Sequence, residues 1–121
     1  MIRCIELRGE FIRGLNIEIK KGSRTEIVLE RQAGDEFLEM LLGLKTSFSG
    51  KVFLMDKDIQ GLKEAQLIEL RKGIGTVFRE GGLISNLRAW ENLTLPALYH
   101  KIASPEIIRE RGLQLLETLG F

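Results

Sequence analysis

A change in the spacing of apolar residues, from every second position to helical spacing, is the feature that most constrains the fold of this chain. Over the first thirty residues apolar and polar side chains alternate, most regularly in the stretch 15–20. Alternation with a period of two is typical of strands that bury one face. From residue 34 to residue 44 the apolar positions instead follow the spacing of a helix. We therefore expect residues 2–29 and 51–55 to form a mainly antiparallel sheet region, covered by a buried helix at 34–44.

The rest of the chain continues to alternate between the two spacings. Ser104 suits a helix N-cap and Pro105 suits the first helical position, so a helix is expected from there to about residue 119. The order predicts a mixed α/β (α+β) fold in one domain over residues 1–121. Further strands are expected at 25–29, 51–55 and 74–78, and further helices at 63–72 and 87–95.

Composition and charge exclude several classes of function. Of the residues, 44% are hydrophobic and 29% charged, and no apolar run approaches the roughly 18 residues of a membrane span. Lys and Arg number 18 against 17 Asp and Glu, a net charge of +1 that gives no field to attract nucleic acid. We expect a soluble protein that neither enters a membrane nor binds nucleic acid.

The reactive side chains give no sign of a metal site or a disulfide. Cys4 is the single cysteine, so an internal disulfide is impossible and a reducing compartment, the cytoplasm, is expected. His100 is the single histidine and lies far from Cys4 in the sequence, which argues against zinc. We expect a buried Cys4, an exposed His100 and no metal.

Four stretches in a fixed order suggest a family. These stretches are LNIEIKKG at 15–22, LLGL at 41–44 with SGKVF at 49–53, ELRKGIGTVF at 69–78, and VFREGGLISNLRAWENLTLP at 77–96. Together they resemble the ATP-binding subunits of ABC transporters, closest to the ATPases of Mce/Mla-type lipid-transport complexes.

The resemblance implies a partial P-loop NTPase fold with an antiparallel β-subdomain, equivalent to the N-terminal half of such a subunit. It also implies a cytoplasmic protein held at the inner membrane by a partner, either a membrane permease subunit or a full-length ABC ATPase. The family's signature loop, Walker B strand and switch histidine have no counterpart in the 121 residues. A truncated fragment that self-associates as a homo-oligomer is therefore an alternative.

The stretch LERQAGDEF at 29–37 takes the place of the family's phosphate loop, G-x-x-x-x-G-K-[ST]. Only Gly34 matches; Asp35 replaces the phosphate-binding lysine and Glu36 the hydroxyl residue. At about 4 Å and an effective dielectric near 20, each unit-charge contact is worth about 4 kcal/mol, so attraction would become repulsion. Arg79 replaces the glutamine of the Q-loop and offers no acceptor to Mg²⁺. The expectation is a non-catalytic protein without a nucleotide cofactor.

The alternative on the side of enzymes is a subunit that contributes half of a composite ATPase site in a heterodimer. The family's adenine-stacking aromatic has one candidate here, Phe11, which we expect to be a core residue instead.

The last stretch predicts a surface for partner binding. In the family, the loop after the Q position and the next helix face the membrane subunit. Gly82 allows the loop to adapt, Leu83 and Ile84 put apolar side chains at its tip, and Trp90 is a residue type that often anchors interfaces. The alternative is that its apolar residues, with Leu93, belong to the core. The predicted partner-binding residues are Arg79, Glu80, Gly82, Leu83, Ile84, Leu87, Trp90 and Glu91.

Overall fold

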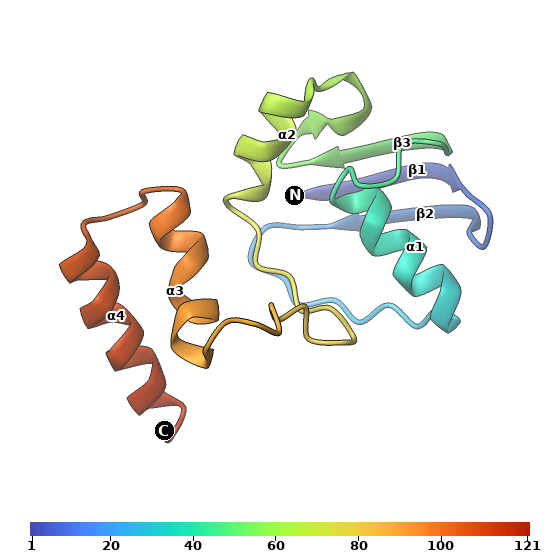
Figure 1. Ribbon diagram of the computed structural model, residues 1–121. Coiled ribbons are helices and arrows are strands. Elements are labelled where there is room, and N and C mark those ends of the chain that lie inside the picture. The colour runs from blue at the N-terminus through green and yellow to red at the C-terminus, as the bar shows by residue number, and fades with distance from the viewer. The chain divides into compact units, whose positions relative to one another are not determined.

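An antiparallel sheet organises the first part of the chain in the computed structural model, which describes residues 1–121 (Figure 1). The sheet order is β2-β1-β3-β4, and every neighbouring pair is antiparallel. The predicted mixed fold class is confirmed, and so is the antiparallel sheet, except that residues 25–29 do not join it. The strands are β1 (Ile2–Arg8), β2 (Arg13–Ile19), β3 (Ser49–Leu54) and β4 (Lys57–Asp58).

The chain divides into two units, residues 1–74 and 75–121. The first holds the sheet, α1 (Arg31–Leu41), the short 3-10 helix η1 (Ile59–Gly61) and α2 (Glu64–Arg71). The second holds α3 (Ala89–Tyr99) and α4 (Pro105–Thr118). The prediction of one domain over residues 1–121 stays a prediction.

A bulge at Glu6 explains why the buried positions of β1 do not follow strict alternation. The pairing with β2 shifts between Cys4 and Leu7, and Glu6 has a φ of 48°. As a result Cys4 and Leu7, three residues apart, are both buried. Opposite the bulge, Gly50 has a φ of +88°, and a Cβ there would lie 2.4 Å from the Glu6 carbonyl oxygen. The bulge therefore requires glycine at position 50.

Helix α1 covers one face of the sheet and supplies much of the core of the first unit (Figure 1). Phe37 and Met40 turn inward from it and join Cys4, Leu7 and Val52 among the buried apolar residues. Arg71 ties α2 to the C-terminal end of α1: its Nε donates to the Leu42 carbonyl at 2.7 Å and its Nη2 to the Gly43 carbonyl at 3.2 Å. These bonds satisfy carbonyl groups that the helix end leaves without partners.

Two predicted strands are absent. Residues 25–29 and 74–78 form neither strands nor bridges, and Val28 and Val77 are 88% and 91% exposed. Both segments carry β-branched side chains, but the sheet offers neither a neighbour to pair with. A strand needs a ladder of hydrogen bonds as well as propensity, so the prediction is wrong here.

In the second unit, α3 and α4 pack as a helical hairpin. Trp90 lies against Gly112, where an added Cβ would come within 2.9 Å of the indole ring. Ser104 caps α4 by accepting from the Ile107 N–H at 3.4 Å, and Pro105 opens the helix as predicted. Pro96 lies inside α3 without ending it. No helix in the protein combines the length and apolar character that crossing a bilayer requires.

Candidate functional site

The three residues predicted to replace the phosphate loop lie inside a helix. Helix α1 begins at Arg31, three residues before the predicted start, so Gly34, Asp35 and Glu36 belong to its first two turns. The Gly34 N–H donates to the Glu30 carbonyl at 2.8 Å, an ordinary helical hydrogen bond. Asp35 faces outward, whereas Glu36 is buried. These positions therefore do not form a loop whose N–H groups could wrap a phosphate.

The Glu36 carboxylate is bound by the loop between β1 and β2. Its Oε1 accepts from the Glu10 N–H at 2.7 Å, and its Oε2 accepts from the N–H groups of Phe11 and Ile12 at 2.8 and 3.0 Å. The Lys45 ammonium group also donates a hydrogen bond to Oε1, at 2.6 Å. Both carboxylate oxygens are thus satisfied, and the charge is compensated by a cation.

This environment makes Glu36 more acidic than an ordinary glutamate. Burial opposes ionisation, but the bonds from Lys45 and the backbone N–H groups outweigh it and lower the pKa of Glu36 from 4.5 to about 2. In return, the Glu36 carboxylate raises the pKa of Lys45. The negative charge of Glu36, which was predicted to repel a phosphate, is therefore paired with Lys45 in a structural ion pair.

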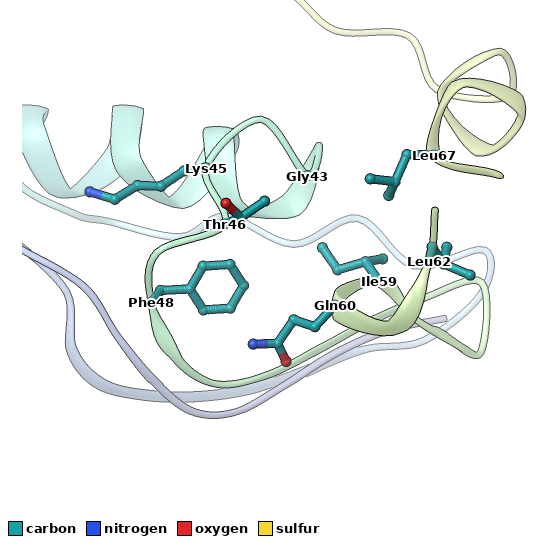
Figure 2. A pocket seen from close by; sticks show the side chains of 8 residues that line it. All are labelled: Gly43, Lys45, Thr46, Phe48, Ile59, Gln60, Leu62 and Leu67. Carbon is teal, nitrogen blue, oxygen red and sulfur yellow. The ribbon is translucent and has the colours of Figure 1, made fainter. Parts of the chain in front are cut away.

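A half-open cavity of about 120 Å³ lies between the segment after α1 and the 3-10 helix η1 (Figure 2). Phe48 and Ile59 supply apolar walls, and Thr46 and Gln60 supply neutral polar groups. Figure 2 shows the amine of Lys45 directed away from this space, in keeping with its bond to Glu36. The cavity has room for a single small side chain or a few solvent molecules.

The predicted partner-binding residues lie along the loop 79–88 and the first turn of α3. Leu83 and Ile84 are 74% and 46% exposed, so the alternative that places them in the core does not hold. Trp90 is half-buried against Gly112. Arg79, Glu80, Gly82 and Glu91 are exposed, and Leu87 is half-buried. The structure brings these residues onto one continuous segment, and their role in binding stays a prediction.

Two glycines and one carboxylate shape this loop. Gly81 and Gly82 have φ values of 81° and 67°, and the Gly81 N–H donates to the Phe78 carbonyl at 2.9 Å, which closes a turn. Glu91 accepts from the Arg88 N–H at 2.7 Å and so caps α3. Part of its acceptor capacity, which we expected to serve a partner, is used within the chain.

Asn92 is the residue in this region that the sequence did not reveal. Its side chain bonds the backbone of Ile84 in both directions and donates to the carbonyls of Leu87 and Arg88 as well. One asparagine thus fastens the loop to α3. In the sequence it stands in a formal glycosylation sequon, a pattern that says nothing about such a bond.

Phe11 differs from its expectation. Phe11 is 41% exposed in the β1–β2 loop, and the buried residue is its neighbour Ile12. The expectation that Phe11 is a core residue is therefore wrong, and its N–H group, like that of Ile12, bonds the Glu36 carboxylate. No group of three or more His, Cys, Asp or Glu residues lies together to hold a metal ion.

Comparison with known proteins gives relatives for nearly the whole chain, although no family model matches it. A methionine import ATP-binding protein, MetN, of Rhizobium johnstonii is 33% identical over 126 residues, covering 99% of this chain and 34% of the relative. The lipoprotein-releasing system ATP-binding protein LolD of Aquifex aeolicus is 36% identical, with 94% and 52% covered. The intermembrane phospholipid transport system ATP-binding protein MlaF of Haemophilus influenzae is 30% identical, with 88% and 40% covered.

Solved structures agree with the sequence comparison. The ATP-binding cassette MJ0796, in a dimeric post-hydrolysis state with ADP and Pi, matches with a TM-score of 0.78 and 26% identity. The match covers 97% of this chain and 56% of the cassette. Of the three sequence relatives named above, the chain spans about a third to a half of the length.

These relatives correct the expectation that the protein is not an enzyme. A cassette captured after hydrolysis, with ADP and Pi, shows that the homologues are ATPases. The expectation rested in part on Glu36 as a charge that repels a phosphate, and that part of the argument fails because the Glu36 carboxylate is paired with Lys45. Sequence identity and fold together show that the chain belongs to the family of ABC-transporter ATP-binding subunits.

Proposed function

We propose that this chain is a cassette-type module of an ABC transport system and that it docks on its partner through the segment 79–91, here called the docking segment. The partner is a membrane permease subunit or a full-length ABC ATPase, and through it the chain is held at the inner membrane. Relatives named for import, lipoprotein release and phospholipid transport support a transport role.

The observation that carries the proposal is an exposed apolar tip on a loop that is already ordered. Leu83 and Ile84 are 74% and 46% exposed, yet Asn92 holds the backbone of Ile84 with two hydrogen bonds. Exposed apolar side chains gain free energy when a partner covers them. Because the loop is fixed in advance, binding loses less of that gain to ordering.

The test is a binding measurement with candidate permease subunits in detergent. Leu83→Ser with Ile84→Ser should leave the fold intact and weaken binding at least tenfold, because two exposed anchors are lost. The matched control is Val28→Ser with Leu44→Ser, which removes two exposed apolar side chains, 88% and 56% exposed, from the first unit. A folded docking-segment variant that binds as tightly as the control would refute the proposal.

A second candidate is a subunit that contributes half of a composite ATPase site. The exposed Phe11 ring favours it, because the resemblance gives an aromatic residue in this region the role of stacking on adenine. The dimeric state of the solved cassette fits a site shared between two subunits. A stability scan of the chain with a candidate subunit and Mg-ATP tests this: at 100 times the dissociation constant, the ligand should add about 2.7 kcal/mol. Phe11→Ala should reduce that gain.

A further inference from the structure

The loop between β1 and β2 presents three successive backbone N–H groups to a single point. Those of Glu10, Phe11 and Ile12 converge on one carboxylate at 2.7, 2.8 and 3.0 Å, and the Lys45 ammonium reaches it at 2.6 Å. Successive backbone N–H groups that point into one concavity form an anion-binding nest. The donors come from the loop and from the segment after α1, and the carboxylate comes from α1 itself.

The loop that carries these donors is also held by contacts that do not involve the carboxylate. The Gly9 N–H donates to the Ile12 carbonyl at 2.9 Å and closes the loop, and β1 and β2 fix its two ends. Gly9 has no room for a side chain: a Cβ there would lie 2.3 Å from Met40 Cε and 2.4 Å from Glu36 Oε1. The hairpin thus has a closing hydrogen bond of its own, α1 packs closely on the loop, and Glu36 fills the concavity that the N–H groups line.

We propose that the β1–β2 loop and Lys45 form a receptor for oxyanions, and that the Glu36 carboxylate is its built-in ligand. The chemical class that the donors recognise is a carboxylate or phosphate group with two oxygens to share among four N–H donors. While α1 keeps its first two turns, Glu36 occupies the receptor and excludes anions from solution. The receptor belongs to the first unit and the docking segment to the second, and the inference does not depend on the proposed function.

The experiment opens the receptor by Glu36→Ala in the full chain. The probes are sodium acetate and inorganic phosphate, each compared with sodium chloride at equal ionic strength. The amide signals of residues 10–12 are followed by NMR. We expect both probes to move these three amides saturably in Glu36→Ala and to leave them unmoved in the wild type. A response to acetate alone would restrict the receptor to carboxylates, and a response to phosphate alone would restrict it to phosphates.

Two controls separate a receptor from a general salt effect. Glu39→Ala removes an exposed carboxylate from the same helix and should show no oxyanion response. Glu36→Ala combined with Lys45→Met should bind the probes about tenfold more weakly, since a charged donor is lost. The proposal fails if the amides of residues 10–12 do not respond to the probes in Glu36→Ala. It also fails if the same amides respond as strongly in the wild type or in the double variant with Lys45→Met.

A variant that leaves the receptor empty can lose its fold, and this outcome also decides. If Glu36→Ala is unfolded in chloride, millimolar acetate or phosphate should restore its circular dichroism, because the anion then replaces the missing ligand. Glu36→Ser, which leaves a smaller and more polar space, repeats the test. Failure of both variants to fold in all three salts, or absence of an amide response in whichever variant folds, overturns the proposal.

Discussion

The side chain of Asn92 holds the backbone of Ile84 in both directions: Oδ1 accepts from the Ile84 N–H at 2.8 Å, and Nδ2 donates to the Ile84 carbonyl at 3.1 Å. A side-chain amide that bonds one residue in this way replaces the strand neighbour that a loop lacks. The bond fixes the most exposed apolar part of the docking segment to α3, and it links local structure to the proposed binding.

Removal of this amide should release the loop without unfolding the chain. We expect Asn92→Ala to cost about 1 to 2 kcal/mol of stability, because Asn92 is only half-buried and water can satisfy the freed backbone groups. The Ile84 amide should then exchange its hydrogen much faster, and partner affinity should fall although Leu83 and Ile84 are retained. Asn86→Ala, an exposed asparagine on the same loop, is the control. Equal exchange rates in both variants would show that the Asn92 bond does not order the loop.

The Glu36 ion pair predicts how stability depends on pH. The folded-state pKa of Glu36, about 2, lies below the ordinary glutamate pKa of 4.5, so the stabilisation is complete above about pH 4.5 and is lost as pH falls toward 2. With allowance for screening through the partly exposed Lys45, the loss should amount to about 2 kcal/mol.

Urea titrations of wild type and Glu36→Gln between pH 2 and pH 7 measure this loss. Glu36→Gln should be less stable at pH 7, because an amide oxygen cannot serve all the donors of a carboxylate, and its stability should vary less in the acid range. Parallel pH profiles for the two proteins would contradict the assignment of the acid loss to Glu36.

The sequence predicts the sheet and the helices well because their signals are local. Ser104 and Pro105 mark the start of α4, and the alternation at 15–19 marks β2. The segments 25–29 and 74–78 have the same local signal, but they do not become strands because pairing depends on neighbours elsewhere in the chain. Strand propensity describes which local conformation a segment favours, but it does not say whether a neighbouring strand is available for pairing.

In the candidate site, too, features with a local signal could be predicted from the sequence, whereas features that depend on distant residues could not. Exposure of Leu83 and Ile84 could be anticipated, since they follow two glycines in a loop. The role of Glu36 could not, because its partners at residues 10–12 are about 25 positions away in the sequence. A charge read in isolation looks repulsive, whereas its actual effect depends on the donors that the fold brings to it.

A pair of helical glycines provides the last prediction, since identical substitutions should act in opposite directions. At Gly112 in α4 a Cβ would lie 2.9 Å from Trp90 Cη2 and 3.2 Å from Cζ3, closer than side chains normally approach. Gly112→Ala should therefore displace the indole and destabilise the helical hairpin by about 1 to 3 kcal/mol, beyond what alanine adds in helix propensity. At Gly34 in α1 a Cβ would meet nothing within 4 Å, so Gly34→Ala should stabilise the chain by up to about 1 kcal/mol.

Thermal unfolding followed by far-UV circular dichroism and by tryptophan fluorescence measures both effects, because Trp90 is the single tryptophan and reports on the second unit. We expect the fluorescence transition of Gly112→Ala at a lower temperature than in the wild type, and the dichroism transition of Gly34→Ala at a higher temperature. If the fluorescence transition temperature of Gly112→Ala is unchanged, Trp90 does not pack against Gly112 in solution.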